Sequence, residues 1–169
     1  MLVEGYLFSS NRWYIIVIIP KSLTANSFEC ELNEKEEIKK MINNFLIINC
    51  TGKNNSIALK TDNKFFIKKL QNNINSNNLL VSNIINFVSK YNVKMSDKYS
   101  VIVNMGPGSY SSLRISISVA KGIHIVCGSR LYGYKSDQIS ELNLENIKIL
   151  IKNKQLEEKV VNPIYQIKD

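Results

Sequence analysis

The residues best placed to do chemistry form a glycine-rich turn near the middle of the chain: Gly106, Pro107, Gly108 and Ser109. If a helix begins after this turn, its free N–H groups and its dipole would attract an anion such as phosphate. However, no lysine follows the second glycine as in a P-loop, and the glycine spacing of dinucleotide-binding folds is missing. We therefore favour a structural turn over a phosphate cradle, and both hypotheses stay open.

The other reactive side chains are isolated from one another. Ser109 and its neighbours have no assigned base, so capping of a helix explains them better than nucleophilic catalysis. Three cysteines are widely spaced without a Cys-x-x-Cys pair, which argues against a zinc site or a disulfide scaffold: Cys30, Cys50 and Cys127. We expect Cys50 and Cys127 to be inert buried thiols. His124 is the single histidine of the chain, and we expect it in the core or at an interface.

The segment after the turn can be read in two ways. Ile115, Ile117 and Val119 alternate with serines as in a strand, but Leu113, Ile117, Ala120, His124 and Cys127 recur at helical spacing. A strand over 111–127 would be unusually long, so we predict a helix that Ser109 or Ser111 caps and Gly128 ends. Gly122 inside this helix lowers helix stability by about 1 kcal/mol relative to alanine. We therefore expect that a second backbone packs closely against it. The charge of Arg114 in the first turn opposes the helix dipole. Two interpretations stay open: the side chain has a carboxylate or carbonyl partner, or it is simply exposed to solvent.

The elements that position these residues are indicated by the pattern after Met41. Strands are predicted at 45–50, 56–60 and 64–70, and their short turns make them an antiparallel meander. A helix over 79–91, a strand over 99–104, the helix over 111–127 and a strand over 131–134 complete the order βββαβαβ, an α/β fold. Beyond these, residues 147–151 and 160–164 are predicted to form a hairpin.

Composition bounds the class of protein. The chain has 169 residues, 44% hydrophobic content and a net charge of +8. Residues 1–40 carry five Lys/Arg against six Asp/Glu, whereas residues 41–169 carry 17 against 8. The basic residues are scattered, so we favour a solvated basic surface over a nucleic-acid site. The longest apolar run, Trp13–Ile19, is short of the roughly 20 residues of a membrane span. Without a secretory signal or paired cysteines, the expectation is a cytoplasmic protein with no membrane partner.

Residues 1–40 differ in pattern from the rest of the chain. Trp13–Ile19 predicts one buried strand ended by Pro20, and residues 32–40 have the acidic start and basic end of a short helix. One hypothesis is that Met41 is the true initiator. In that case residues 1–40 are an upstream extension without a fold of their own.

The order of elements and the central motif together resemble the TsaB (YeaZ) branch of the actin-like ATPase superfamily. The run Gly106-Pro-Gly-Ser-Tyr-Ser-Ser-Leu-Arg-Ile-Ser-Ile-Ser-Val-Ala-Lys-Gly122 is similar to that family's GPGSFTGLRIG…AKG signature. Gly133-Tyr-Lys-Ser136 is similar to its G-V-S-S turn, and Asn162-Pro-Ile-Tyr165 to its terminal P-x-Y. The resemblance implies an actin-like ATPase (ribonuclease H-like) lobe over 41–135. It leaves 1–40 as an extension and 136–169 as a truncated second lobe.

The resemblance implies a non-catalytic subunit that needs no cofactor or metal. Such a subunit supports a TsaD-like catalytic subunit, with a TsaE-like ATPase, in threonylcarbamoylation of the anticodon-adjacent adenosine of tRNA, which it meets only indirectly. Asn49 stands where active members of the superfamily have an aspartate for Mg²⁺ or phosphate. The partner would pack on the two helices, through residues that we expect to include Leu80, Ile84, Phe87, Arg114, Ile117, Ala120, Lys121 and His124. Alone, the chain could form a homodimer.

Two other classes of function are kept. The first is an active enzyme of the same superfamily, an ATPase, kinase or metal-dependent peptidase, which would have to bind Mg-ATP or a metal. The second is a basic tRNA-binding module that acts alone, whose binding would fall steeply with salt.

Overall fold

The computed structural model describes residues 4–9, 12–17, 42–52, 54–71, 77–158 and 161–165. The chain divides into two compact units, Met1–Lys40 and Met41–Asp169. In the first unit, β1 (Glu4–Ser9) and β2 (Arg12–Val17) form an antiparallel hairpin closed at the Ser9–Arg12 pair. β2 covers most of the strand predicted at Trp13–Ile19. The helix predicted over 32–40 lies outside the described residues.

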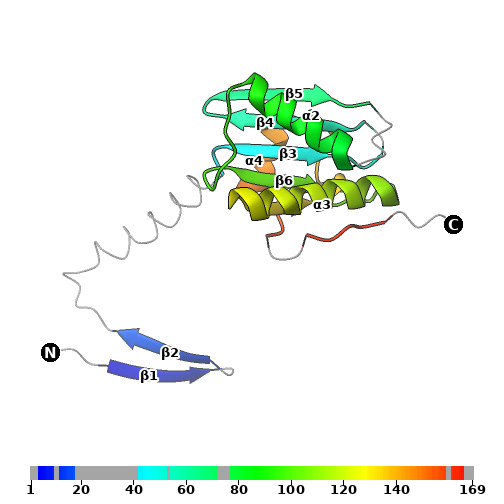
Figure 1. Cartoon of the computed structure of the whole chain (residues 1–169). Coiled ribbons are helices and arrows are strands. Elements are labelled where there is room, and N and C mark those ends of the chain that lie inside the picture. The colour runs from blue at the N-terminus through cyan, green and yellow to red at the C-terminus, as the bar shows by residue number, and fades with distance from the viewer. Residues whose placement is uncertain are drawn as a thin grey trace. The chain divides into compact units, whose positions relative to one another are not determined.

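The second unit is built on one mixed sheet (Figure 1). Its strands are β3 (Phe45–Asn49), β4 (Ser56–Thr61), β5 (Lys64–Lys69), β6 (Ser100–Asn104) and β7 (Arg130–Tyr134), in the spatial order β5-β4-β3-β6-β7. The first three strands pair antiparallel, because turns of a few residues can only join antiparallel neighbours. β6 pairs parallel with β3 and with β7. The predicted meander and the order βββαβαβ are confirmed.

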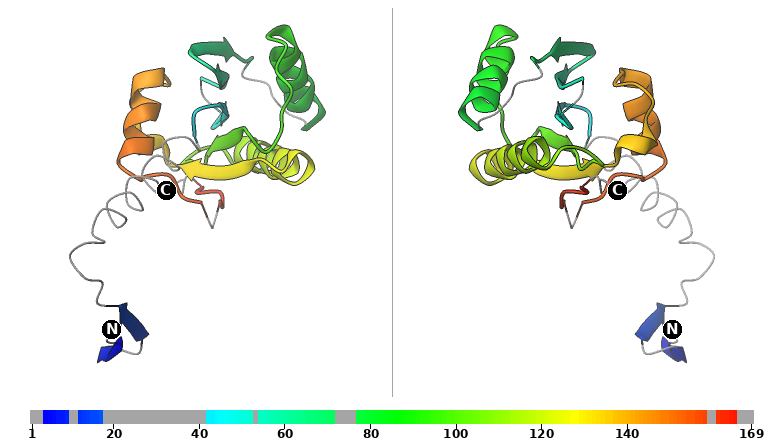
Figure 2. Two further views of the ribbon diagram at one scale, coloured as in Figure 1. Left: turned by 90° about the vertical axis from the view of Figure 1, so that its left-hand side faces the viewer. Right: turned by 90° about the vertical axis from the view of Figure 1, so that its right-hand side faces the viewer.

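Helices cover both faces of this sheet. Two of them, α2 (Asn77–Lys90) and α3 (Tyr110–Cys127), lie on one face, and α4 (Leu144–Lys152) lies on the other (Figure 2). Along β3, Leu46 and Ile48 belong to the core under α2 and α3, whereas Phe45 and Ile47 belong to the core under α4. Because both faces are covered, the central strands read as continuous apolar runs.

The helix over the predicted 111–127 segment is present with the expected ends. The Ser109 side chain accepts a hydrogen bond from the N–H of Ser112 at 3.4 Å, and Gly128 ends the helix with a left-handed φ of 65°. Leu113, Ile117 and Ala120 are buried at helical spacing against the sheet. The helical interpretation of this segment is therefore confirmed over the strand-like alternation of Ile115, Ile117 and Val119.

The hairpin predicted for 147–151 and 160–164 is wrong. Residues 144–152 are the helix α4, which comes after a short 3₁₀ turn at Ser136–Gln138. The Asn143 side chain caps α4 by accepting from the N–H of Asn146 at 2.8 Å, and Ile147 and Leu150 face the sheet. The described residues 161–165 run elsewhere, since the Ile164 N–H donates to the Met105 carbonyl at 2.7 Å.

Within the described parts of the chain, no helix has the length and apolar character that a membrane crossing requires.

Candidate functional site

The Gly106–Ser109 turn is a junction of three segments. Gly106 has a φ of 108°, and a Cβ at this position would overlap the carbonyl oxygen of Ile164. A Cβ at Gly108 would lie 2.6 Å from the carbonyl oxygen of Thr51, in the turn after β3. Both positions therefore need glycine because a second backbone comes close. The turn joins the end of β6, the turn after β3 and the C-terminal segment.

Several backbone donors at this turn are engaged within the chain. The Ser109 N–H donates to the Thr51 carbonyl at 2.8 Å, and the Leu113 N–H donates to the Ser109 carbonyl at 3.1 Å. The Ser109 hydroxyl caps Ser112. Since the N–H groups of Ser109 and Ser112 would have to be free to hold an anion, these contacts favour the structural turn over the phosphate cradle.

A row of neutral polar side chains crosses the sheet where the parallel strands end. The Asn104 amide of β6 donates to Asn49 Oδ1 of β3 at 2.8 Å, and the Asn49 amide donates to Ser56 Oγ of β4 at 3.4 Å. On the other side, the Ser136 hydroxyl and the Gly106 N–H both donate to Asn104 Oδ1, at 3.0 and 2.8 Å. We call these residues (Asn49, Ser56, Asn104 and Ser136) the amide row.

The amide row does not fit a divalent cation. Mg²⁺ and Ca²⁺ prefer carboxylate oxygens, and the row contains none. The amide oxygen of Asn49 already accepts from Asn104. Across the residues that the structure describes, no cluster of three His, Cys, Asp or Glu side chains could hold a metal.

A hollow of about 680 Å³ opens beside the amide row, on the α4 face of the sheet. Its polar side includes the amide row, Asn55 and Tyr134, and its apolar side includes Ile67, Ile139 and Leu142. The buried Asn55 Nδ2 has no hydrogen-bond partner among the described residues. Burial raises the pKa of Tyr134, and a hydrogen bond with the Asn104 side chain opposes that rise. We call this hollow the α4-side pocket.

The thiols differ from one another. Cys50, at the end of β3, is buried, and burial raises the pKa of its thiol to about 12, a rise that a hydrogen bond with the Ser56 backbone opposes. The predicted burial of this thiol is confirmed, and we expect it to be unreactive. Cys127 is only half-buried at the end of α3, so the prediction of a buried thiol is wrong there. Cys30 lies outside the described residues.

The solvent side of α2 and α3, the α2–α3 face, is unusually apolar. Of the nine exposed large apolar side chains among the described residues, six lie on these two helices: Leu79, Val81, Ile85, Tyr110, Ile125 and Val126. The exposed fractions of Ile85, Ile125 and Val126 are 57%, 77% and 85%. A Cβ added at Gly122 would meet nothing within 4 Å, so no backbone among the described residues approaches it. The close approach predicted at Gly122 is thus not made within the described part of the chain.

The side chains of α2 fall on two sides of the helix. Asn83 accepts a hydrogen bond from Lys68 of the edge strand β5 at 2.8 Å, so this side of α2 points toward β5. Val81 and Ile85 lie about 160–200° around the helix from Asn83 and therefore lie on the side toward α3. Val81 and Ile85 thus lie on the α3 side of α2.

Most of the predicted contact residues lie on the buried side of the helices. Five of them are buried in the core and hold the helices on the sheet: Leu80, Ile84, Phe87, Ile117 and Ala120. They are not open to a partner. The residues that the prediction missed, such as Ile85 and Val126, interrupt the polar side of each helix. That signal is readable from the sequence, because an apolar residue outside the core stripe needs a reason.

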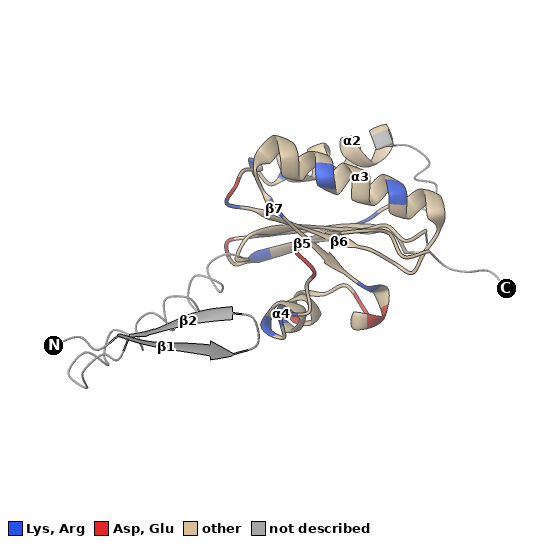
Figure 3. Cartoon of the chain, turned by 90° about the horizontal axis from the view of Figure 1, so that it is seen from below, with Lys and Arg blue, Asp and Glu red and all other residues tan. Residues whose placement is uncertain are grey.

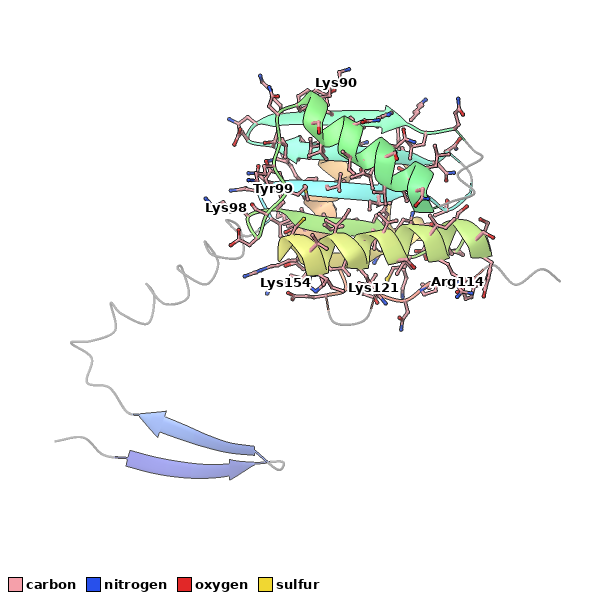
Figure 4. The ribbon with its side chains drawn as sticks, in the orientation of Figure 1. Lys90, Lys98, Tyr99, Arg114, Lys121 and Lys154 are labelled. Carbon is pink, nitrogen blue, oxygen red and sulfur yellow. The ribbon has the colours of Figure 1, made fainter. Side chains whose placement is uncertain are left out.

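The other three predicted contact residues are exposed: Arg114, Lys121 and His124. Figure 4 shows Arg114 and Lys121 on the side of α3 away from α2. Arg114 donates to the Tyr110 hydroxyl and lies 5.0 Å from the centre of that ring, so its partner is neither a carboxylate nor a carbonyl. His124 Nδ1 contacts the Ser129 carbonyl just beyond the helix. Neither α2 nor α3 contains an acidic residue, as Figure 3 shows.

Comparison with known proteins gives a structural match. No protein-family model matches the sequence, and a search of curated proteins finds no match. The structure is similar to YeaZ from Pseudomonas aeruginosa, with a TM-score of 0.51 and 17% identity over 56% of this chain and 44% of that chain. A solved structure described as an uncharacterized protein with similarity to peptidase YeaZ from Pseudomonas aeruginosa matches with a TM-score of 0.49, 18% identity and the same two shares.

The match thus spans less than half the length of YeaZ, and at this identity it concerns the fold. The chain has, over the matched part, the α/β fold of YeaZ, an actin-like ATPase fold, as the resemblance of its sequence predicts.

Proposed function

We propose that this chain is a TsaB-like subunit of a tRNA-modifying complex. In this proposal it does no chemistry itself and supports a TsaD-like catalytic subunit, with a TsaE-like ATPase, in threonylcarbamoylation of the adenosine beside the anticodon. The YeaZ fold and the Gly106–Gly122 motif support the family. The resemblance of the sequence implies the partner, and the widely spaced cysteines are the reason to expect a cytoplasmic location.

The observation that carries the proposal is the apolar character of the α2–α3 face. Burying a valine or isoleucine side chain gains about 1.5–3 kcal/mol, so leaving Ile85, Ile125 and Val126 in water forgoes a large gain. We take these exposed apolar residues as an interaction surface, since large exposed apolar patches mark such surfaces. The open space at Gly122 would let the backbone of a partner helix come close. Helix packing on helix is the contact that the resemblance to TsaB implies.

The amide row supports a non-catalytic role. A catalytic centre for ATP needs charged groups that hold a metal ion and stabilise developing negative charge. At the ends of the parallel strands this chain instead has amides and hydroxyls that bond to each other. The polar side chains at this edge of the sheet thus make their hydrogen bonds without an ion.

Co-purification of the full chain with a tagged TsaD-like protein tests the proposal. Gly122→Leu and Ile85→Glu change exposed positions of the α2–α3 face, and the space around Gly122 keeps the first from disturbing the fold. Ile149→Glu is the matched control, because Ile149 is 51% exposed on α4, on the other face of the sheet. We expect both face variants to lose the partner and the control to keep it. A wild-type chain that ignores the partner, or face variants that bind normally, would contradict the proposal.

A further inference from the structure

We propose that a second pocket, beside α3, binds a carboxylate that carries an apolar group. The pocket has a volume of about 500 Å³ and lies between the last turns of α3, the start of β7 and the C-terminal segment, which runs along α3 in Figure 1. The carboxylate belongs either to a free small acid or to the C-terminus of a polypeptide. We call this hollow the α3-side pocket, and its lining consists of Lys121, His124, Ile125, Arg130, Leu131, Glu158, Val161 and Asn162.

The fold holds three segments in place around this pocket. The chain turns back at Gly128, which ends α3, so Arg130 at the start of β7 returns beside the last turns of the helix. The C-terminal segment is fixed at the edge of β7, because the N–H of Glu157 donates to the Gly133 carbonyl and the N–H of Gly133 donates to the Glu157 carbonyl, both at 2.8 Å. Further along, the same segment bonds to the residue that follows β6. The walls of the pocket are therefore set by the backbone.

The first support is a pair of basic side chains that lack a carboxylate partner. Lys121 lines the pocket from α3, and Arg130 lines it from β7. Among the described residues, the single ion pair joins Lys135 to Glu157 at 3.6 Å, so neither Lys121 nor Arg130 is part of one. A basic residue near the end of a helix also suits the helix dipole, but Arg130 is on a strand, where that reason does not apply. A bound carboxylate would give both cations a partner.

The second support is the orientation of the His124 ring, one turn after Lys121 on α3. Its Nδ1 contacts the Ser129 carbonyl, and because a carbonyl oxygen only accepts, Nδ1 carries the proton of this contact. Nε2, on the other side of the ring, is therefore the nitrogen left for a ligand, and in the protonated ring it donates to a carboxylate oxygen. Asn162 adds an amide group to the same lining.

The charges and the apolar side chains of the lining define the class of ligand. Lys121 and Arg130 carry two positive charges and Glu158 carries one negative charge, so the lining has a net charge of +1 when His124 is neutral. A monocarboxylate matches this charge, whereas a phosphate dianion would leave excess negative charge beside Glu158. The lining also offers three apolar side chains against which an alkyl group can pack: Ile125, Leu131 and Val161.

The inference goes beyond the proposed function and can fail without it. Of the described residues that line the pocket, Ile125 alone also belongs to the α2–α3 face. Lys121 lies on the side of α3 away from α2 (Figure 4). Substitutions at Lys121, Arg130 and Glu158 therefore leave the proposed partner surface intact, and these variants should still co-purify with a TsaD-like protein.

Calorimetric titration of the full chain with four probes tests the inference: N-acetyl-leucine, 4-methylpentanoate, N-acetyl-leucinamide and inorganic phosphate. The first imitates the C-terminus of a polypeptide, the second is a free acid, and the third lacks the carboxylate. We expect at least one of the two acids to bind with a Kd of about 1 mM or below, and the amide and phosphate to bind at least about tenfold more weakly. The acid that binds more tightly identifies the source of the carboxylate.

Charge substitutions locate the binding in the pocket. Arg130→Gln should weaken binding of the acid about tenfold or more, the effect of one hydrogen bond to a charged group, and Lys121→Gln should weaken it in the same direction. Glu158→Gln removes a like charge and should tighten binding about two- to fivefold. Lys152→Gln makes the same charge change as Lys121→Gln at an exposed position of α4, outside the pocket lining, and should bind as the wild type does.

Any of four results would overturn the inference: no saturable binding of either acid, equal or tighter binding of the amide or of phosphate, unchanged binding by Arg130→Gln, or an equal loss in Lys152→Gln. Weaker binding by Glu158→Gln would contradict the charge balance on which the choice of ligand rests. The substituted side chains are exposed, so the variants should fold, and thermal melting of each variant checks this.

Discussion

Replacing Gly106 by alanine should destabilise the second unit more than its small size suggests. The added Cβ would overlap the Ile164 carbonyl oxygen and lie 3.0 Å from the Leu113 side chain. Leu113 can turn away, but a backbone carbonyl cannot. The C-terminal segment would have to move, and its hydrogen bond from the Ile164 N–H to the Met105 carbonyl would be lost.

The size of the effect comes from two terms. Holding a non-glycine residue at a φ of 108° costs about 1–3 kcal/mol. The lost hydrogen bond adds about 1 kcal/mol. We therefore expect Gly106→Ala to lower the free energy of unfolding by about 2–4 kcal/mol, and the melting temperature by about 10 °C.

Urea unfolding followed by circular dichroism measures this change. Gly122→Ala is the matched control, because its new Cβ meets nothing and its helix gains about 0.5–1 kcal/mol. The reasoning is refuted if Gly106→Ala lies within about 0.5 kcal/mol of the wild type. In that case the C-terminal segment does not rest on the turn as described.

Three further changes test other parts of the structure. Ser109→Ala removes the cap of α3 and should cost about 1 kcal/mol in urea unfolding, whereas Ser111→Ala, exposed in the first turn, should cost less than half of that. Ala120→Arg places an unpaired charge at a fully buried position and should lower the free energy of unfolding by more than about 4 kcal/mol. It should therefore abolish cooperative unfolding, whereas the control Lys121→Ala should still unfold cooperatively. The pKa of the Cys50 thiol is raised from 9.0 to about 12, so the folded state holds this proton more tightly than the unfolded state. The contribution of this protonated thiol to the free energy of unfolding is complete below pH 9 and falls as the pH rises toward 12. In a chain with Cys30→Ser and Cys127→Ser, a thiol reagent at pH 8 should therefore react with Cys50 far more slowly in buffer than in urea, and equal rates would contradict its burial.

The order of elements could be predicted because local and tertiary signals agree. Strand β3 is apolar at every position but its last because helices cover both faces of the sheet. In α3, Ser109 and Gly128 mark the ends, and Leu113, Ile117 and Ala120 give the helical period. These features need no knowledge of the rest of the chain.

The segment at 147–151 shows where the pattern is ambiguous. Ile147, Ile149 and Ile151 alternate with other residues as in a strand, while Ile147 and Leu150 are spaced as in a helix. The helix forms because Asn143 caps it and because the sheet offers an apolar surface at the right place. That surface includes residues of β3 and β6, which are far away in the sequence, so no local signal decides the matter.

The contact residues were misplaced for a related reason. A regular apolar stripe on a helix is first of all a core, and Leu80, Ile84 and Phe87 serve that purpose. The docking surface that we propose comes from the apolar residues left exposed, such as Ile85 on α2 and Val126 on α3. Which exposed residues lie together depends on how the two helices are placed on the sheet, and this is visible only in the structure.

The structure satisfies its polar side chains at the strand ends but leaves apolar side chains on the helices exposed to water. At the ends of β3 and β6, Asn49 and Asn104 bond to each other, so the sheet edge needs no ion. An aspartate at position 49 could still accept from Asn104, but its charge would call for a cation that the surrounding residues do not supply. The apolar residues of the α2–α3 face have no such internal solution, because the core beneath them is already filled by Leu80 and Ile117. Stability of the fold therefore does not depend on a bound ion, whereas covering the helical face is the role that we propose for a second molecule.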